Sequence, residues 1–356
     1  MSTSSTSHPV RDLHERLEAG PVLCAEGYLF ELERRGYLKA GAFVPEVVLE
    51  HPDALAQVHR EFVRAGSDII EAFTYYGHRE KLRQIGKEEQ LEPLNRQALR
   101  LAHDVAAEFE DRPLVAGNLA NTNVYRPGDD DAIAHARAMF EEQARWAAEE
   151  GADLVIGETF YAAGEARLAL EVIAEVGLPG VITLALPAQG TLLDDVTIAD
   201  ACAALEDDGA DVVGLNCFRG PATLLPPLRR ILDRVSIPVA ALPVPYRTTE
   251  DHPTYFDLPD PDATVAPPGG QTFPLALEPS LCTRFEVAAF ARTALELGVR
   301  YLGLCCGAAP HLIRSMAEEL GRTPPASRYS PDLAEHSILG TDPRLTARAR
   351  DRAGDR

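Results

Sequence analysis

The chain has 356 residues, of which 46% are hydrophobic and 25% are charged, and its formal net charge is −21. This composition is typical of a soluble globular protein with a full hydrophobic core, and it argues against intrinsic disorder. The acidic excess argues against nucleic acid as a partner, because proteins that bind phosphate backbones present clustered Lys and Arg.

The sequence shows no targeting or membrane signal. Residues 1–10 are rich in Ser and Thr without the apolar core of a secretory signal, and no segment approaches the ~20 apolar residues of a membrane span. We therefore expect a cytoplasmic protein with no membrane partner. In that reducing compartment the six cysteines are too few for a disulfide scaffold, which favours free thiols or metal ligands.

Eight short apolar runs alternate with stretches of helical periodicity, a pattern typical of repeated βα units. Several runs follow a Gly that would end the preceding helix, as in Ala65-Gly66-Ser67-Asp68. Eight such units predict a closed (β/α)₈ or TIM barrel. The alternative, a doubly wound open sheet, usually has fewer strands and a Gly-rich phosphate turn after the first. The predicted strands span residues 22–25, 68–73, 114–118, 154–157, 180–184, 212–215, 239–242 and 301–304.

Three segments do not follow this alternation of predicted strands and helices. We predict a single barrel over residues 13–322, preceded by a disordered N-terminus over residues 1–12. Residues 323–356 are expected to form a C-terminal arm that is partly disordered. The Pro- and Gly-rich residues 243–277 are far too long for an ordinary βα loop and should carry no regular structure. Because this segment follows the seventh strand, we expect it on the catalytic face.

Three cysteines stand where predicted strands end: Cys217 after the sixth, and Cys305 and Cys306 after the eighth. The active site of a TIM barrel lies at this end of the strands, so the thiols would converge above the barrel axis. Three thiolates with one open position are typical of a catalytic zinc site. The neighbouring Gly303 and Gly307 should let the backbone approach the metal. The competing interpretation, small buried hydrophobes, is the one we adopt for Cys24, Cys202 and Cys282.

Other predicted strand ends carry an acid and several aromatic residues. Glu158, after the fourth strand, needs a cationic partner if it is buried, either a substrate ammonium or an internal Arg such as Arg284. Tyr75, Tyr76 and Phe43 offer ring faces that could hold an onium methyl donor by cation–π attraction, although aromatic residues also serve as plain packing.

The chain contains the sequences HREFVRAGSDIIEAFTYYGHREKL, GLNCFRGP and LGVRYLGLCCG. With the segments around them, these resemble the betaine–homocysteine methyltransferase branch of the zinc-dependent homocysteine S-methyltransferase family, over nearly the whole chain to about Ser330. GxNC and GxCCG are the metal motifs of that family. The resemblance implies a (β/α)₈ barrel in which Cys217, Cys305 and Cys306 bind Zn²⁺ and the homocysteine sulfur takes the fourth position.

The resemblance also implies roles for other side chains. Glu158 matches the glutamate that holds the homocysteine amino group, Tyr76 the tyrosine of the donor site, and Asn216 the Asn of the zinc motif. Zinc would lower the pKa of the substrate thiol from ~8.5, so no separate protein base is needed. The predicted substrate-binding set is completed by Glu26, Gly27 and Thr74, and the donor-binding set by Tyr75, Phe43 and Thr159.

Three departures from the family pattern matter. The family carries Asp-Gly-Gly after the first strand, where this chain has Ala25-Glu26-Gly27, so the carboxylate is displaced or its role is lost. The betaine-using branch has a Trp in place of Phe43 and a Tyr in place of Thr159. The tail is shorter than the extension that builds a tetramer in animal enzymes, so a homodimer is the largest assembly we expect.

We therefore predict a zinc-dependent S-methyltransferase that moves a methyl group from a betaine-like onium donor to the thiol of homocysteine, giving methionine. One alternative keeps this chemistry with S-methylmethionine or a dimethylsulfonio donor, and another uses a thiol acceptor other than homocysteine. A third is a non-catalytic barrel that binds zinc and thiols. A metal-free hydrolase is disfavoured, because no predicted strand end pairs a Ser or Asp nucleophile with a His.

Overall fold

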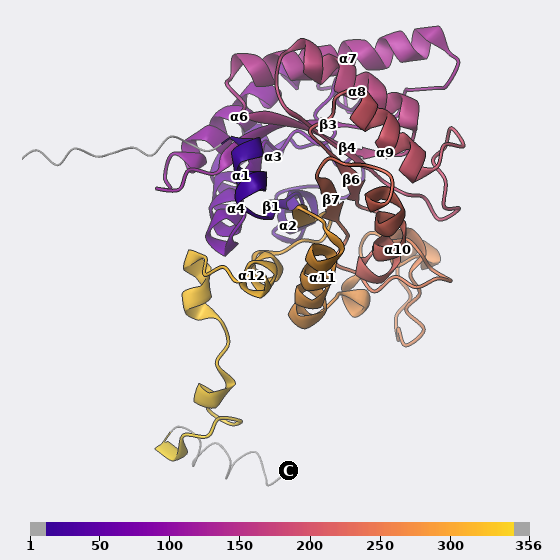
Figure 1. Ribbon diagram of the computed structural model, residues 1–356. Coiled ribbons are helices and arrows are strands. Elements are labelled where there is room, and N and C mark those ends of the chain that lie inside the picture. Colours follow the sequence, from indigo (N-terminus) through magenta and orange to yellow (C-terminus); the bar gives the residue numbers. More distant parts are fainter. Residues whose placement is uncertain (1–11, 345–356) are drawn as a thin grey trace, which may run out of the picture.

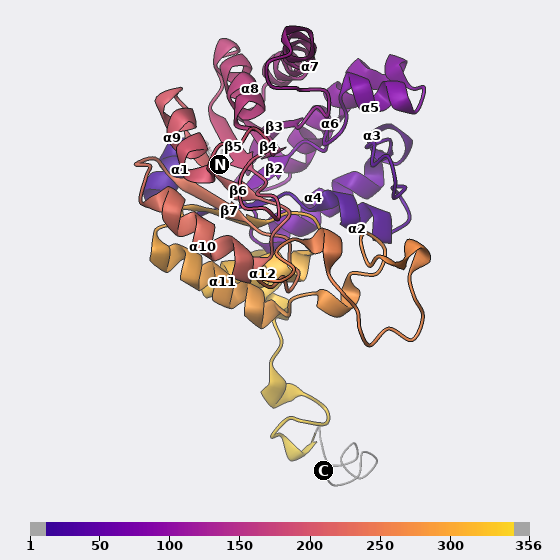
Figure 2. The same cartoon turned by 90° about the vertical axis from the view of Figure 1, so that its right-hand side faces the viewer.

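The computed structural model describes residues 12–344. Within them, eight parallel strands close into a barrel in chain order, with β8 beside β1 (Figures 1 and 2). The predicted single (β/α)₈ barrel is therefore confirmed. The strands are β1 Val22–Ala25, β2 Ile69–Glu71, β3 Leu114–Ala120, β4 Leu154–Phe160, β5 Gly180–Leu184, β6 Val212–Asn216, β7 Val239–Leu242 and β8 Tyr301–Leu304.

Helices surround the barrel on its outer face (Figure 2). They are α1 Leu13–Ala19, α2 Tyr28–Arg34, α3 Val47–Glu50, α4 Pro52–Ala65, α5 Arg79–Gln84, α6 Leu91–Ala106, α7 Asp130–Glu149, α8 Ala163–Glu175, α9 Ile198–Asp207, α10 Pro221–Leu232, α11 Arg284–Leu297 and α12 Pro310–Glu319. None of the described helices is long and apolar enough to span a membrane.

Helix α4 shows how the sequence sets these elements. Pro52 opens the helix, where its missing N–H costs nothing. Leu55, Val58 and Phe62 recur at helical spacing and are buried on one face. Gly66 ends the helix with φ 113°, a left-handed conformation that other residues rarely adopt, and the chain turns into β2.

Four strands differ from the predicted bounds. β3 and β6 end two residues and one residue later than predicted, and β2 and β4 differ for local reasons. β2 is shorter than predicted, because the Thr74 N–H donates to the Ala72 carbonyl over 2.7 Å and turns the chain out of the sheet. β4 is longer, because its ladder with β3 continues as far as the pair Ala120 and Glu158, and its ladder with β5 resumes at Phe160 and Leu184 beyond an irregularity. Glu158 thus lies within a strand rather than after it.

The barrel interior is a packed core rather than a channel. Inward-pointing residues such as Cys24, Ile156 and Tyr301 form one buried cluster, which also includes Leu13 and Leu17 of α1. Cys24 is therefore a core residue, as the sequence suggests. Cys202, in α9, and Cys282 belong to the cluster between barrel and helices.

The two irregular segments are placed as follows. Residues 243–277 contain only short 3₁₀ turns, at Tyr255–Asp257 and Pro268–Gly270. After α12 the chain leaves the barrel as an arm with turns at Pro325–Tyr329 and Leu333–Glu335 (yellow in Figure 1). Asp12, at the edge of the predicted disordered N-terminus, caps α1. Residues 1–11 and 345–356, on which the other disorder predictions fall, lie outside the described residues.

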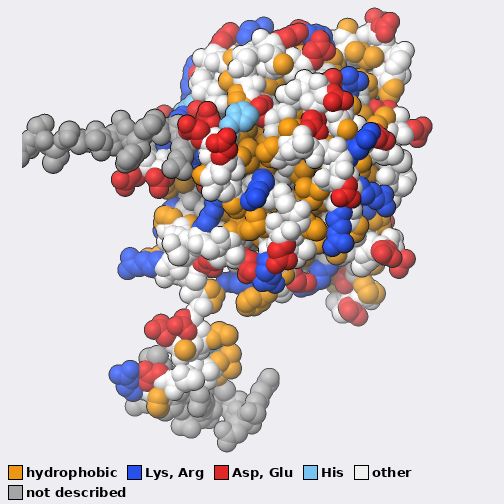
Figure 3. Space-filling view, in the orientation of Figure 1, with side chains coloured by type: hydrophobic (Ala, Val, Ile, Leu, Met, Phe, Trp, Pro, Cys, Tyr) orange, Lys and Arg blue, Asp and Glu red, His pale blue; other side chains and the backbone are white. Residues whose placement is uncertain are grey.

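Acidic and basic side chains are interspersed over the face shown in Figure 3. Many form ion pairs between neighbouring helices. Arg96 of α6, for example, contacts Glu149 and Glu150 at the end of α7 over 2.5 and 2.9 Å. Such exposed pairs add little stability individually, so the buried barrel core dominates the fold.

Candidate metal centre and active site

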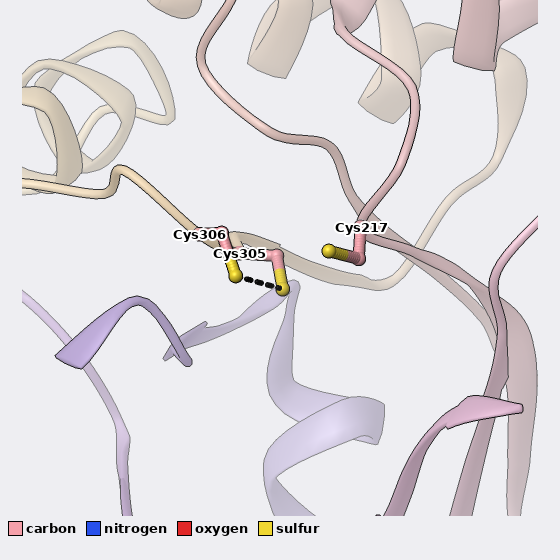
Figure 4. A group of neighbouring side chains, drawn as sticks. All are labelled: Cys217, Cys305 and Cys306. Carbon is pink, nitrogen blue, oxygen red and sulfur yellow. Dashed lines mark hydrogen bonds between the residues drawn. The ribbon is translucent and has the colours of Figure 1, made fainter. Parts of the chain in front are cut away.

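Three thiols meet at the carboxyl end of the barrel. The Sγ atoms of Cys217, Cys305 and Cys306 all lie within 4.8 Å of one another, and Cys217 points toward the other two (Figure 4). The Cys305 and Cys306 sulfurs are 4.0 Å apart. Two sulfurs bound to one tetrahedral zinc at ~2.3 Å would be separated by roughly 3.8 Å. The thiols therefore fit a single Zn²⁺.

The exposure of the thiols leaves one side of this group open. Cys217 and Cys305 are each 3% exposed, whereas Cys306 is partly exposed. Hydrogen bonding from Cys305 and then Cys306 holds the pKa of Cys217 well below its usual range, and hydrogen bonding with Cys217 raises the pKa values of Cys305 and Cys306. These opposite directions follow from the short distances between the thiols, because adjacent buried thiolates repel one another.

Backbone strain concentrates at the same end of the barrel. Among the described non-Gly residues, those with φ between 52° and 63° include Tyr76, Asn123, Thr159, Cys217 and Phe218, which follow or end β2, β3, β4 and β6. Such conformations cost about 1–3 kcal/mol each and cluster at functional sites. Here they lie in or directly beside the segments that carry the proposed site residues.

The glycines beside the thiols lie in close contact with neighbouring backbone and side chains. A Cβ on Gly303 would lie 1.9 Å from the Cys24 carbonyl oxygen, and one on Gly307 would lie 2.6 Å from the Tyr246 hydroxyl. These glycines therefore permit close packing against β1 and Tyr246, and their predicted role in backbone approach to a metal stays a prediction. Gly27, a predicted substrate-binding residue, packs against the turn that carries Cys305. A Cβ added to Gly27 would lie 2.6 Å from the Cys305 carbonyl oxygen.

Glu158 lies at the centre of a buried hydrogen-bond network. Asn118 Nδ2 donates to its Oε1 over 2.8 Å, Asn216 Nδ2 donates to its Oε2 over 2.8 Å, and the Thr159 hydroxyl donates to Oε2 over 3.2 Å. Within residues 12–344, no Lys, Arg or His forms an ion pair with Glu158, so the suggested pairing with Arg284 is absent. Burial raises the pKa of Glu158 to about 8.

Two further carboxyls border this network. Asn118 Nδ2 also donates to Glu71 Oε1 over 2.7 Å, and Asn216 Nδ2 lies 3.4 Å from Glu26 Oε2. Burial, and then the nearby Glu158, raise the pKa values of Glu26 and Glu71 well above their usual range. The predicted substrate residue Thr74 donates to the Asn118 carbonyl oxygen over 3.1 Å. It thus positions β3, and its contact with substrate stays a prediction.

Two buried acceptor atoms beside the thiols have no donor. Glu26 Oε1 and Asn118 Oδ1 make no hydrogen bond to any described residue. Ligand atoms of Glu26, Glu158 and Cys305 lie within 4.8 Å of one another. The Glu26 carboxyl therefore lies in the site, although this chain has Ala25-Glu26-Gly27 where the family carries Asp-Gly-Gly. Because buried acceptors are rarely left unpaired, these atoms indicate where a ligand with N–H donors would bind.

The predicted donor residues fall into separate groups. The Tyr75 and Tyr76 rings are 4.4 Å apart, and the Lys81 ammonium lies 4.2 Å above the Tyr76 ring. This cation–π contact shows that the ring accepts a cation. Phe43 packs against Phe30, with ring centroids 6.3 Å apart. The Thr159 N–H donates to Asn216 Oδ1 over 3.0 Å, so Thr159 supports the network.

Several residues of the site escaped sequence reasoning. Asn118, which joins two carboxylates, ends the predicted third strand and could have been recognised as a buried polar residue there. Tyr161 hydrogen-bonds to Asn121 and Asn123 over 3.0 Å each, and its ring stacks on Phe218. Tyr255 contacts Cys217 from the long irregular segment, where the sequence carries no periodic signal.

Solved structures share the fold. Homocysteine methyltransferase MmuM from Escherichia coli, in its oxidised form, superposes with a TM-score of 0.67 at 20% sequence identity, covering 87% of this chain and 99% of that one. Its metallated form superposes with a TM-score of 0.64 at 19% identity, covering 84% and 96%. These likenesses support the barrel fold.

Sequence comparison identifies the family. Residues 27–320 match the homocysteine S-methyltransferase family. The chain is 35% identical to betaine–homocysteine S-methyltransferase 1 of Xenopus tropicalis, over 96% of this chain and 84% of the relative. It is 34% identical to S-methylmethionine–homocysteine S-methyltransferase BHMT2 of Pongo abelii, over 96% of this chain and 91% of the relative. The chain therefore belongs to the homocysteine S-methyltransferase family.

Proposed function

We propose that this protein is a zinc-dependent enzyme that moves a methyl group from an onium donor to the thiol of homocysteine, giving methionine. Cys217, Cys305 and Cys306 would hold the zinc. When bound, the metal would lower the pKa of the substrate thiol, so that a thiolate is available at neutral pH. The protein then needs no general base, and its other residues bind and orient the two substrates.

One observation carries this proposal: three convergent thiols lie beside buried acceptors that have no donor. Glu26 Oε1 and Asn118 Oδ1 are unpaired, and Glu158 supplies a carboxylate next to them. An ammonium has three N–H donors and a positive charge, so it would satisfy these atoms and keep Glu158 ionised. Homocysteine carries both a thiol and an ammonium. The site thus favours homocysteine over a thiol that lacks an amine.

The donor is proposed to be a betaine-like onium compound. Tyr76 holds a cation against its ring, and Tyr75 packs beside it. The named donors of the relatives are betaine and S-methylmethionine, and the identities of 35% and 34% do not choose between them. Donor identity is therefore decided by the assay.

The test is metal analysis of the purified protein, followed by methyl transfer to homocysteine from betaine, S-methylmethionine and a dimethylsulfonio acid. We expect one zinc per chain and methionine as the product, formed from one or more of these onium donors. Zinc without methyl transfer to any thiol would indicate the non-catalytic barrel and overturn the proposal. Absence of zinc would overturn the metal assignment.

Further predictions concern the partners, the assembly and the location of the protein. Small-molecule substrates agree with the named substrates of the relatives. A homodimer stays a prediction, which sedimentation of the full chain would test. A cytoplasmic location and the absence of a nucleic-acid partner likewise stay predictions.

A further inference from the structure

The long segment after β7 contacts the metal centre in two places. The Pro243 carbonyl oxygen accepts from the Cys305 N–H over 3.0 Å, and Tyr255 lies against Cys217 and Phe218. The Tyr255 N–H donates to the Phe218 carbonyl oxygen over 2.9 Å, and the Tyr255 hydroxyl lies 3.6 Å from Cys217 Sγ. Cys217 and Phe218 both hold the strained left-handed conformation. Tyr255 thus contacts the sulfur of Cys217 and the backbone of the next residue, Phe218.

The surroundings of Tyr255 fix its hydroxyl in place. The side chain is 4% exposed, and its ring packs against Phe256 and Phe273 with centroids 4.6 and 5.0 Å away. Among residues 12–344, Cys217 Sγ is the recorded hydrogen-bond partner of this hydroxyl. Because a buried tyrosine hydroxyl usually finds a partner, the contact with sulfur is the one that the packing provides.

The direction of this hydrogen bond follows from the metal. A thiolate that binds zinc has no proton, so the hydroxyl must donate. Three thiolates outnumber the two positive charges of Zn²⁺, and the carboxyls of Glu26 and Glu158 lie nearby. A donor to sulfur offsets part of this excess negative charge. On the Cys305 sulfur, Asn216 Nδ2 approaches in the same way, over 3.8 Å.

We infer that Tyr255 is a positioning residue of the metal centre, whose hydroxyl donates to the Cys217 thiolate and strengthens zinc binding. The inference rests on the metal half of the proposed function. It also gives residues 243–277 a role, because this segment carries the donor and the aromatic packing that holds it. Groups around a metal that orient its ligands typically account for about 10–100-fold in metal affinity or activity.

Tyr255→Phe tests this inference, because it removes one oxygen and keeps the ring. The matched control is Tyr246→Phe. Tyr246 is buried in the same segment with its ring 6.0 Å from that of Tyr255, but its hydroxyl accepts from Arg34 Nη2 over 3.1 Å. Zinc affinity is measured for each full-length protein by competition with a chelator. Each is also loaded with Co²⁺, and its thiolate-to-cobalt charge-transfer band is recorded.

We expect Tyr255→Phe to lose about tenfold in zinc affinity. Its charge-transfer band should move to longer wavelength, because a hydrogen bond stabilises the sulfur lone pair. Tyr246→Phe should match the wild type in both measurements. An unchanged affinity and band in Tyr255→Phe, or equal losses in both variants, would overturn the inference while leaving the zinc site intact. A wild-type protein that binds no metal would overturn the metal half of the proposed function as well.

Discussion

Asn216 donates its side-chain amide to Glu158 over 2.8 Å, and the next residue in the chain is the proposed metal ligand Cys217. The same amide nitrogen lies 2.9 Å from the Thr159 hydroxyl, and Asn216 Oδ1 accepts from the Thr159 N–H. One residue thus fixes the carboxylate on β4 relative to the thiol after β6. If Glu158 holds the ammonium of the acceptor, Asn216 sets the distance between the two ends of that substrate.

Asn216→Ala should therefore weaken binding of homocysteine. Hydrogen bonds to charged groups contribute about 1.5–3 kcal/mol, so the KM for homocysteine should rise about 10–100-fold. The KM for the donor should change little. Steady-state kinetics with each substrate varied in turn would check this, with zinc content measured in parallel. A donor KM that rises as much as the homocysteine KM would contradict the proposed link.

Glu158→Gln should also act chiefly on the acceptor. The amide keeps the shape of the side chain but removes the charge that would pair with an ammonium, so we expect homocysteine affinity to fall at least tenfold. Glu165→Gln is the matched control. Glu165 is a buried glutamate in α8, where Thr122 donates to it, and it belongs to no part of the proposed site. Equal acceptor affinity in the two variants would show that the role assigned to Glu158 is wrong.

Much of this site could be predicted because strand ends converge in a barrel. The apolar runs at residues 180–184, 239–242 and 301–304 match β5, β7 and β8, since each is bounded by loop residues and buried throughout. Once the strands were placed, Cys217, Cys305 and Cys306 had to meet at the carboxyl end. Sequence order and topology were enough, and no side-chain detail was needed.

The contacts that depend on rotamers and irregular backbone could not be predicted. Asn118 serves both Glu71 and Glu158 because of where its amide points in the folded core, which no spacing encodes. Tyr255 comes from a segment without periodicity, so its neighbours were unknowable. The close contact of Gly303 was unpredictable for a related reason: its neighbour is the carbonyl oxygen of Cys24 on β1, a contact set by the register of β1 and β8.

Cys217→Ala should abolish zinc retention and methyl transfer together. Loss of one of three thiolates leaves two ligands, both from the turn after β8, and a catalytic zinc site needs three. Metal analysis and the methyl-transfer assay on the same preparation would check this. Cys202→Ala, in which a buried thiol of α9 is replaced, should keep its zinc. Full activity in Cys217→Ala would refute the metal assignment.

Tyr76→Leu should weaken binding of the onium donor. Cation–π contacts contribute about 0.5–2 kcal/mol, so the donor KM should rise about 2–30-fold while the homocysteine KM stays near the wild-type value. A neutral isostere of the donor, tested as a competitive inhibitor, should lose no affinity, because it has no charge for the ring to attract. If donor and neutral isostere lose affinity equally, the ring contributes shape rather than charge recognition.

Glu71 predicts how stability depends on pH. Burial and the nearby Glu158 and Glu26 raise the pKa of Glu71 well above 4.5, the ordinary value in an unfolded chain. Above pH 4.5 the folded protein therefore holds more protons than the unfolded chain, and the free energy of unfolding falls as pH rises. The stability from protonated Glu71 is fully present below pH 4.5 and is lost as pH rises through the folded pKa.

Glu71→Gln removes this proton while keeping an oxygen that can accept from Asn118. We expect its free energy of unfolding to fall less steeply than that of the wild type between pH 5.5 and 8. Relative to Glu71→Gln, the wild type should lose up to about 1.4 kcal/mol of its free energy of unfolding for each pH unit in this window. Urea denaturation of both proteins at several pH values would measure it, with Glu296→Gln, which replaces an exposed carboxylate, as the control. Parallel wild-type and Glu71→Gln curves would mean that Glu71 titrates alike in the folded and unfolded chains, and that the burial of its carboxyl carries no electrostatic cost.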